Sequence, residues 1–278
     1  MNSNNPPVTY WEYVGTDALL DLQRPLTEAH DEMQFIVVHQ AFELWFKLAI
    51  YELRGAVAAL EGGDHARAAH LLHRVATILR TSLHGFDPLM TMKQEGYAEF
   101  RDALAPASGF QSFQFRVMEL LLGVEPVSDE LGHERFYWET AVQAGITFTM
   151  FMEKYHAELL RIRAEQGGRT VRRMMSQAVE AATGAQGADA FRRISEDRES
   201  FPALARLVDA ARDIEAAMLE FRKSHRRVTV FTVGANATGT SDSHGDPAPS
   251  CAAYLQGVIR ERAVIFPEMH EAEAARER

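Results

Sequence analysis

A histidine lies on the apolar face of a helix predicted near the C-terminal end of the sequence. The positions of this face follow three- and four-residue steps, and they are Leu207, Ala211, Ile214, Met218, Phe221, His225 and Val228. An imidazole that points into a helical core needs a partner. That partner is either a backbone carbonyl or the iron of a haem, for which one axial imidazole is enough. The basic neighbours of His225 would then bind haem propionates or form a solvated face (Arg222, Lys223, Arg226 and Arg227).

A second histidine shares a helix face with aromatic residues. His39 comes four residues after Phe35 and three before Phe42, and side chains at these spacings are neighbours on a helix surface. Two interpretations stay open at this point. His39 is either a hydrogen-bonded histidine of the core or a polar group inside an aromatic-lined pocket, where it could position an N–H group or an oxygen species.

A tyrosine and an arginine offer a third chemical group. Tyr97 and Arg101 are four residues apart and would share a helix face. An arginine can bind a carboxylate through two parallel N–H donors, which suits an amino or keto acid. The alternative is a surface ion pair.

Two further sites are less specific. Ser108, beside Gly109, is typical of a helix N-cap, although its hydroxyl could also meet a ligand. The segment with Tyr10, Trp11 and Tyr13 is too aromatic for a free tail, so we expect it to dock on another surface.

Helices must position all of these residues, because the apolar periodicity is helical throughout and no strand alternation is found. Thr27 is a candidate N-cap for the first long helix, and Gly62 and Gly63 end it. A polar loop is expected over 234–249 and a charged tail over 271–278. The predicted helices cover about 27–61, 64–83, 110–122, 134–166, 171–183, 188–198, 204–228 and 252–262, with shorter pieces between 89 and 104, a turn at 85–88 and a break at 106–109.

Composition narrows the class of protein. The 278 residues include 29 Lys and Arg against 39 Asp and Glu, a formal charge of −10, which argues against a nucleic-acid partner. Cys251 is the single cysteine, so an intrachain disulfide is excluded and cysteine-based metal sites are disfavoured. With no secretory signal and no apolar run of membrane-spanning length, we expect a cytoplasmic protein without membrane contact.

Four segments carry a family resemblance that runs through most of the chain. Residues 30–47 (HDEMQFIVVHQAFELWFK) resemble the distal-helix signature of the tryptophan 2,3-dioxygenase family. Phe100-Arg101 with 106–116 (PASGFQSFQFR) resembles its second signature. Residues 10–13 (YWEY) resemble its N-terminal Tyr-x-x-Tyr segment, and 221–225 (FRKSH) resemble its proximal motif.

The resemblance implies an all-α fold, a single-domain helical bundle of the tryptophan 2,3-dioxygenase type. One haem-binding oxygenase domain would span 1–278, with 1–20 docking on a neighbouring subunit and 234–250 forming an active-site loop. It also implies a homotetramer, one haem b (iron protoporphyrin IX) per subunit, O2 as co-substrate, and tryptophan or a derivative as substrate.

The same resemblance implies roles for individual residues. His225 would be the axial iron ligand and His39 the distal catalytic histidine that meets the indole N–H. The implied substrate-binding residues are Phe35 and Tyr97 around the indole, Arg101 on the carboxylate, Ser108 near the haem edge or distal pocket, Thr240 in the loop, and Tyr10 and Tyr13 reaching the neighbouring subunit's site.

Two departures from the family pattern leave the reaction outcome open. Phe221 stands where tryptophan is usual, and the loop 238–245 (TGTSDSHG) differs from the family's Gly-Thr-Gly-Gly-Ser-Ser-Gly. Loop closure controls water exclusion and the fate of intermediates. The first hypothesis is dioxygenation across the indole C2=C3 bond to N-formylkynurenine. The second is monooxygenation of tryptophan or β-methyltryptophan to a 2-oxindole in secondary metabolism. The third is a non-catalytic haem or small-ligand sensor, against which the pair His39 and Arg101 argues.

Overall fold

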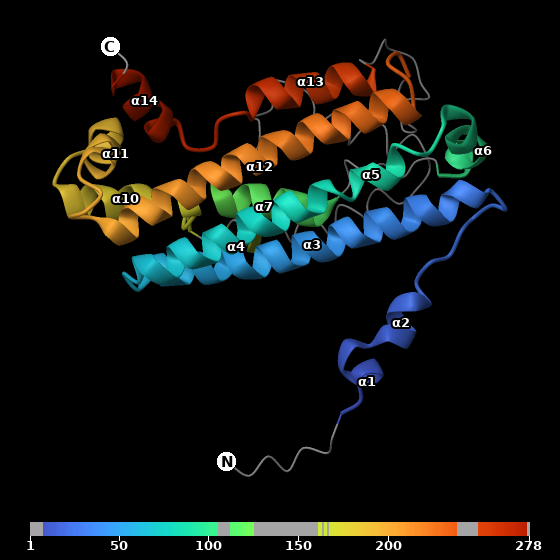
Figure 1. Ribbon diagram of the computed structural model, residues 1–278, viewed down its shortest axis with the longest axis horizontal. Coiled ribbons are helices and arrows are strands. Elements are labelled where there is room, and N and C mark those ends of the chain that lie inside the picture. The colour runs from blue at the N-terminus through green and yellow to red at the C-terminus, as the bar shows by residue number, and fades with distance from the viewer. Residues whose placement is uncertain are drawn as a thin grey trace.

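Three long helices form the centre of the protein, whose computed structural model describes residues 8–104, 112–124, 161–162, 164–165, 167–237 and 250–276. They are α3 (His30–Glu61), α4 (His65–Leu83) and α12 (Pro202–Thr232). Helix α4 packs against both of the others and lies between them in Figure 1. Every element in the described part of the chain is helical, as predicted.

Helix α3 begins later than its sequence suggested, so the prediction of Thr27 as N-cap is wrong. The N-cap is Ala29. The Thr27 hydroxyl accepts a hydrogen bond from the Ala29 N–H (3.1 Å) and donates one to Glu32 (2.6 Å). The Glu32 carboxylate also accepts from the N–H groups of Leu26 and Thr27. Local side-chain bonds of this kind compete with the helix, and here they hold the approach to α3 in a turn.

Shorter helices follow α4 along the chain. They are α5 (Phe86–Leu89), α6 (Gln94–Leu104) and α7 (Phe113–Leu122), and the turn predicted at 85–88 is largely the short helix α5. Of these, α6 lies at one end of the bundle and α7 packs against α3 (Figure 1). Helix α7 starts at Phe113 because the Ser112 hydroxyl accepts from the Phe115 N–H. It ends at Gly123 with φ 100°, where a Cβ would lie 2.9 Å from Arg172 Cβ. Glycine therefore relieves both a left-handed backbone and a close approach.

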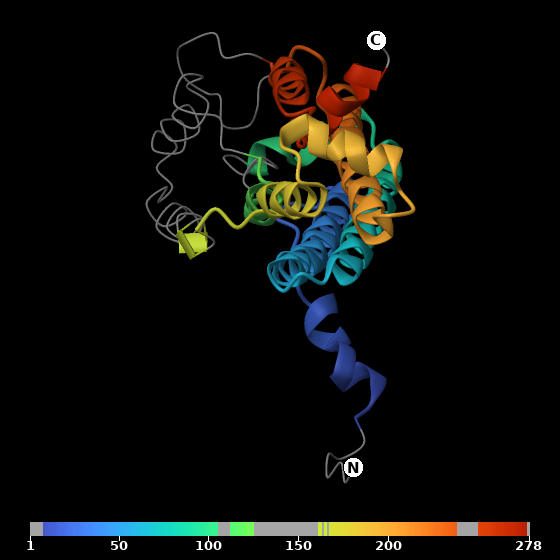
Figure 2. The same cartoon turned by 90° about the vertical axis from the view of Figure 1, so that its left-hand side faces the viewer.

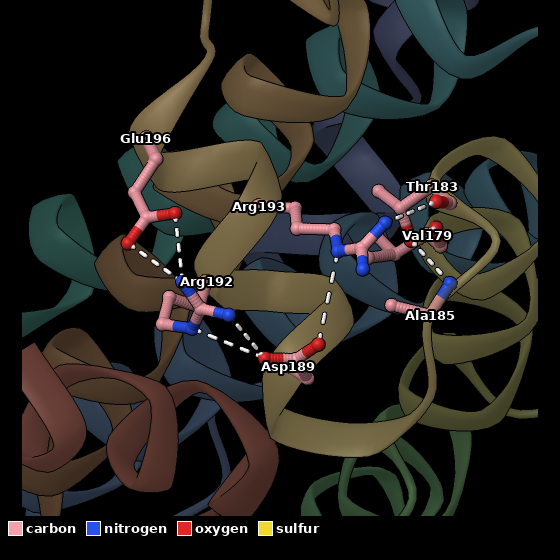
Figure 3. Close-up of polar contacts among 7 residues, drawn as sticks. All are labelled: Val179, Thr183, Ala185, Asp189, Arg192, Arg193 and Glu196. Atoms are coloured by element: carbon pink, nitrogen blue, oxygen red, sulfur yellow. Dashed lines mark hydrogen bonds and ion pairs between the residues drawn. The ribbon is translucent and has the colours of Figure 1, made fainter.

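The opposite end is formed by α10 (Val171–Thr183) and α11 (Gly187–Glu196). Thr183 at the end of α10 accepts a bond from Arg193 through its carbonyl (3.1 Å), and Arg192 binds Glu196 on the same helix (Figure 3). Helix α10 has the predicted bounds, and α11 ends two residues before the predicted 198. The helix predicted over 134–166 and the break at 106–109 lie almost entirely outside the described residues.

The C-terminal residues correct a second prediction. After α13 (Cys251–Glu261), the charged tail is the end of helix α14 (Pro267–Arg276), in which Met269 and Ala272 are buried. The Glu215 carboxylate on α12 accepts bonds from the N–H groups of Ile265 (2.5 Å) and Phe266 (3.0 Å) just before this helix. The buried carboxylate anchors a segment whose charged residues alone suggested a tail.

The N-terminal segment extends away from this body. Helices α1 (Tyr10–Val14) and α2 (Thr16–Leu20) lie beyond the approach to α3 in Figures 1 and 2. Tyr10 is 67% exposed and Tyr13 is 85% exposed within this single chain. Among the helices of the described part, none combines the length and apolar character that crossing a bilayer requires.

Candidate functional site

A cavity of about 470 Å³ opens among helices α3, α5, α6, α7, α12 and α13. It brings together residues that lie up to 190 positions apart in the sequence and that were predicted as site residues. These are Phe35, His39, Tyr97, Arg101 and His225. The cavity wall is mainly aromatic and aliphatic, with few polar groups, which is typical of a small-molecule or cofactor site.

His39 is held in one orientation and one tautomer. Its Nδ1 lies 2.7 Å from the Phe35 carbonyl oxygen. Since a carbonyl can only accept, Nδ1 carries the proton and the neutral ring keeps its lone pair on Nε2. Burial lowers the pKa of His39, while the Phe35 carbonyl and the charge of Glu43 act in the opposite direction with smaller effect. His39 therefore offers a neutral acceptor.

Aromatic rings surround this imidazole. The Phe35 ring lies 4.0 Å from the His39 ring, 5.9 Å from Tyr97 and 5.5 Å from Phe100, centroid to centroid. Such tilted and edge arrangements are favourable for aromatic pairs. Together they make an apolar wall with one polar nitrogen, suited to a flat aromatic ligand that carries a single donor.

Arg101 lies one helical turn after Tyr97 on α6. Burial raises the pKa of the Tyr97 hydroxyl, and the nearby guanidinium charge of Arg101 opposes this effect. Both side chains line the cavity. The prediction that Tyr97 and Arg101 share one helix face is confirmed. A guanidinium that lines a cavity suits a ligand with a carboxylate.

His225 lines the cavity from α12. Burial lowers its pKa to about 4, with smaller contributions in the same direction from His39 and Arg116. The imidazole is therefore neutral at physiological pH, the form that binds a metal. Its ring is nearly parallel to the Phe86 ring, at 6.3 Å and 18°.

One helical turn before His225, Phe221 fits a cluster of phenylalanines. Its ring contacts Phe42, Phe46, Phe86 and Phe115 at centroid distances of 4.9 to 5.5 Å. The phenylalanine that replaces the family's usual tryptophan is thus a packed part of the cavity wall.

A buried ionic cluster lies at the cavity wall, and its central residue was not predicted from the sequence. Glu119 on α7 binds Arg116 (2.6 Å), Arg222 (3.0 Å) and Arg262 (2.7 Å). Burial is the largest single influence and raises the pKa of Glu119, but the three arginines together outweigh it and lower this pKa to about 2. The one available signal was a glutamate inside the apolar run Val117–Leu122.

The residues present fit a haem. Among the described residues, the cluster has three guanidinium groups and one carboxylate, and Arg116 and Arg222 also line the cavity. The buried Nε atoms of Arg222 and Arg262 have no hydrogen-bond partner among the described residues. A cavity with a neutral imidazole, an apolar wall and surplus positive charge suits an iron porphyrin that carries carboxylates.

Two of the predicted site residues are described and do not line this cavity, and two are not described. Tyr10 and Tyr13 lie on α1, exposed and away from the bundle. Ser108 and Thr240, with the loop 238–249, lie outside the described residues. Glu43 and Ser112 also line the cavity. They were not predicted from the sequence, because their roles depend on contacts between helices.

Comparison with known proteins gives matches to the family that the sequence motifs resemble. The family model of tryptophan 2,3-dioxygenase matches residues 2–165. A tryptophan 2,3-dioxygenase of Bacillus thuringiensis subsp. konkukian (strain 97-27) is 32% identical over 269 residues, covering 94% of this chain and 90% of the relative. The enzyme of that name from Bradyrhizobium sp. (strain ORS 278) is 33% identical over 265 residues, with the same coverage. That of Ruegeria sp. (strain TM1040) is 47% identical over 116 residues, 42% of each chain.

Proposed function

Since the chain belongs to the tryptophan 2,3-dioxygenase family, we propose that it is a haem-dependent oxidoreductase that opens the indole ring of L-tryptophan. Both atoms of O2 enter the product, one at C2 and one at C3, and the C2–C3 bond breaks to give N-formylkynurenine. The reaction needs no external electrons. The observation that carries the proposal is the pair of neutral imidazoles, His39 and His225, on one aromatic cavity that also contains Arg101.

We propose that His225 would bind the iron of a haem b. Its burial and depressed pKa support this role, because a neutral ring nitrogen is available to the iron without first losing a proton. Arg116 and Arg222 would hold the propionates. When bound, the haem supplies the chemistry that activates O2, and the protein supplies ligation, orientation and shielding from water.

His39 would receive the substrate. With Nδ1–H bound to the Phe35 carbonyl, Nε2 is the acceptor that the indole N–H requires. Phe35 and Tyr97 would pack against the indole ring, and the Arg101 guanidinium would bind the substrate carboxylate through two N–H donors. Fixing the amino-acid end and the indole N–H orients C2 and C3 in the cavity, which is the main contribution that positioning makes to rate.

Further assignments concern parts of the chain other than the described cavity lining. Ser108 and Thr240 would supply polar contacts to the ligand, and 234–250 would be an active-site loop of a single domain spanning 1–278. Residues 1–20 would dock on a neighbouring subunit of a homotetramer, with Tyr10 and Tyr13 reaching its site. The exposure of these two tyrosines on a segment that leaves the body supports this assignment. We also propose a cytoplasmic location.

The test is turnover with isotopically labelled oxygen. Reduced, haem-loaded protein supplied with L-tryptophan and ¹⁸O2 should form N-formylkynurenine with two labelled atoms, measured by mass spectrometry. A 2-oxindole with one labelled atom would contradict dioxygenation. No product despite a loaded haem would favour a sensor.

A further inference from the structure

Glu43 is a cavity residue to which the proposed reaction gives no task. It lies on α3 one helical turn after His39, is half-buried, and lines the same cavity. A carboxylate beside an apolar ligand site needs a reason, because an unpaired charge would be unfavourable there.

Hydrogen bonds from α7 and its N-cap hold both carboxylate oxygens of Glu43. Oε1 accepts from the Ser112 hydroxyl at 2.5 Å, and Oε2 accepts from Gln114 Nε2 at 2.9 Å. Gln114 Nε2 also donates to the Glu43 carbonyl at 2.7 Å. The Ser112 oxygen in turn accepts from the Phe115 N–H and so caps α7. The carboxylate is therefore fixed in place and joins two helices that line the cavity.

The fixed negative charge acts on His39. Residues one turn apart on a helix are neighbours, and the charge of Glu43 favours protonation of the His39 ring against the larger effect of burial. A ring in a negative potential is more basic, and its free nitrogen is a stronger hydrogen-bond acceptor. The free nitrogen is Nε2, since Nδ1 is bound to the Phe35 carbonyl.

We propose that Glu43 is a positioning residue that acts through His39: its anchored carboxylate strengthens the hydrogen bond in which His39 accepts the indole N–H. The inference rests on the proposed function, because it needs an indole substrate at His39. Glu43 would then make the site prefer a ligand with an N–H donor to a ligand of the same shape that lacks this donor.

The experiment compares two ligands and two backgrounds. Binding of L-tryptophan and of its benzothiophene analogue, in which sulfur replaces the N–H, is measured with haem-loaded wild type and with Glu43→Gln. This substitution keeps the shape and removes the charge. L-Tryptophan should bind about threefold to tenfold more weakly to the variant, the range for weakening one hydrogen bond. The analogue, which offers no donor to His39, should bind the two proteins equally.

The second background is His39→Ala. There, Glu43→Gln should change L-tryptophan binding by less than about twofold, because the residue through which it acts is absent. Equal weakening of both ligands by Glu43→Gln, or an undiminished effect in the His39→Ala background, would overturn the inference and leave Glu43 as a structural link.

Ser112→Ala is the matched control. It removes one anchor and the cap of α7 but keeps the carboxylate charge, so it should lower the melting temperature while preserving the preference for L-tryptophan over the analogue. Haem content and melting temperature of Glu43→Gln check that it folds. If wild type binds neither ligand, the proposed function fails; if wild type prefers L-tryptophan and Glu43→Gln keeps that preference, only the present inference fails.

Discussion

Two clusters of arginines and carboxylates in this protein have the same chemistry and opposite surroundings. On α11, Arg192 binds Asp189 and Glu196, whose side chains are 50% and 46% exposed (Figure 3). At the cavity, Glu119 binds three arginines while only 4% exposed. The first cluster joins residues three and four apart on one helix. The second joins α7, α12 and the residue that follows α13.

The comparison shows that surroundings decide what an ion pair contributes. Water solvates each charge on α11 whether or not it is paired, so the pairs contribute little. Around Glu119 the charges cannot return to water, and each depends on its partners. Among the described residues this cluster has three arginines and one carboxylate, and two of the arginines line the cavity, so we expect it to serve both stability and the site.

Removing the buried carboxylate should have the largest effect. Glu119→Ala leaves Arg222 and Arg262 buried and unpaired, and we expect a loss of about 3–5 kcal/mol in the free energy of unfolding. Urea unfolding followed by circular dichroism measures it. Asp189→Ala on α11 is the control, and equal losses for the two variants would contradict the contrast.

The second largest difference between the two clusters is expected in the dependence of stability on acid pH. The pKa of Glu119 is about 2 in the folded protein, against about 4.3 in the unfolded chain. A depressed folded pKa gives stability that is fully present above the unfolded value and is lost as pH falls toward the folded value. We expect Glu119 to contribute on the order of 3 kcal/mol to the loss of stability between about pH 5 and pH 2. Glu119→Gln should have a shallower pH dependence in this window, and identical slopes would refute the assignment.

The next prediction concerns Arg101, whose guanidinium is proposed to bind the substrate carboxylate. Loss of a carboxylate contact of this kind removes roughly 2–4 kcal/mol of binding. Steady-state kinetics of Arg101→Ala should therefore show a Michaelis constant for L-tryptophan raised about a hundredfold. Arg192→Ala serves as the distant control, and an unchanged constant in Arg101→Ala would mean that the carboxylate binds elsewhere.

The smallest effect is expected on α11. Arg192→Ala should change the free energy of unfolding by less than about 1 kcal/mol, and high salt should reduce even that difference. Urea titrations at low and high sodium chloride concentration measure it. A larger effect that salt does not screen would show that the exposed cluster behaves like the buried one.

The sequence predicted what depends on local spacing. Helical periodicity placed His39 beside Phe35 and Tyr97 beside Arg101, because neighbours on one helix follow from 3.6 residues per turn. The family resemblance, not the periodicity, gave these residues their roles.

Features that depend on contacts between distant segments were not predictable. Glu119 meets partners 103 and 143 residues away, and Glu43 meets Ser112 across 69 residues. The predicted N-cap of α3 was wrong for a related reason. The Glu32 carboxylate accepts hydrogen bonds from the preceding N–H groups and so replaces the expected cap. Charge alone could not distinguish a tail from a docked helix, since Glu215 supplies the anchor of α14 from α12.

The most direct test of the central claim is the haem spectrum of His225→Gly with and without added imidazole. Wild type and His73→Ala, a control on the exposed face of α4, should bind haem with one axial histidine. His225→Gly should lose haem or that spectrum, and imidazole should restore it by filling the space of the missing side chain. A variant that keeps haem with an unchanged spectrum in the absence of imidazole would contradict the account.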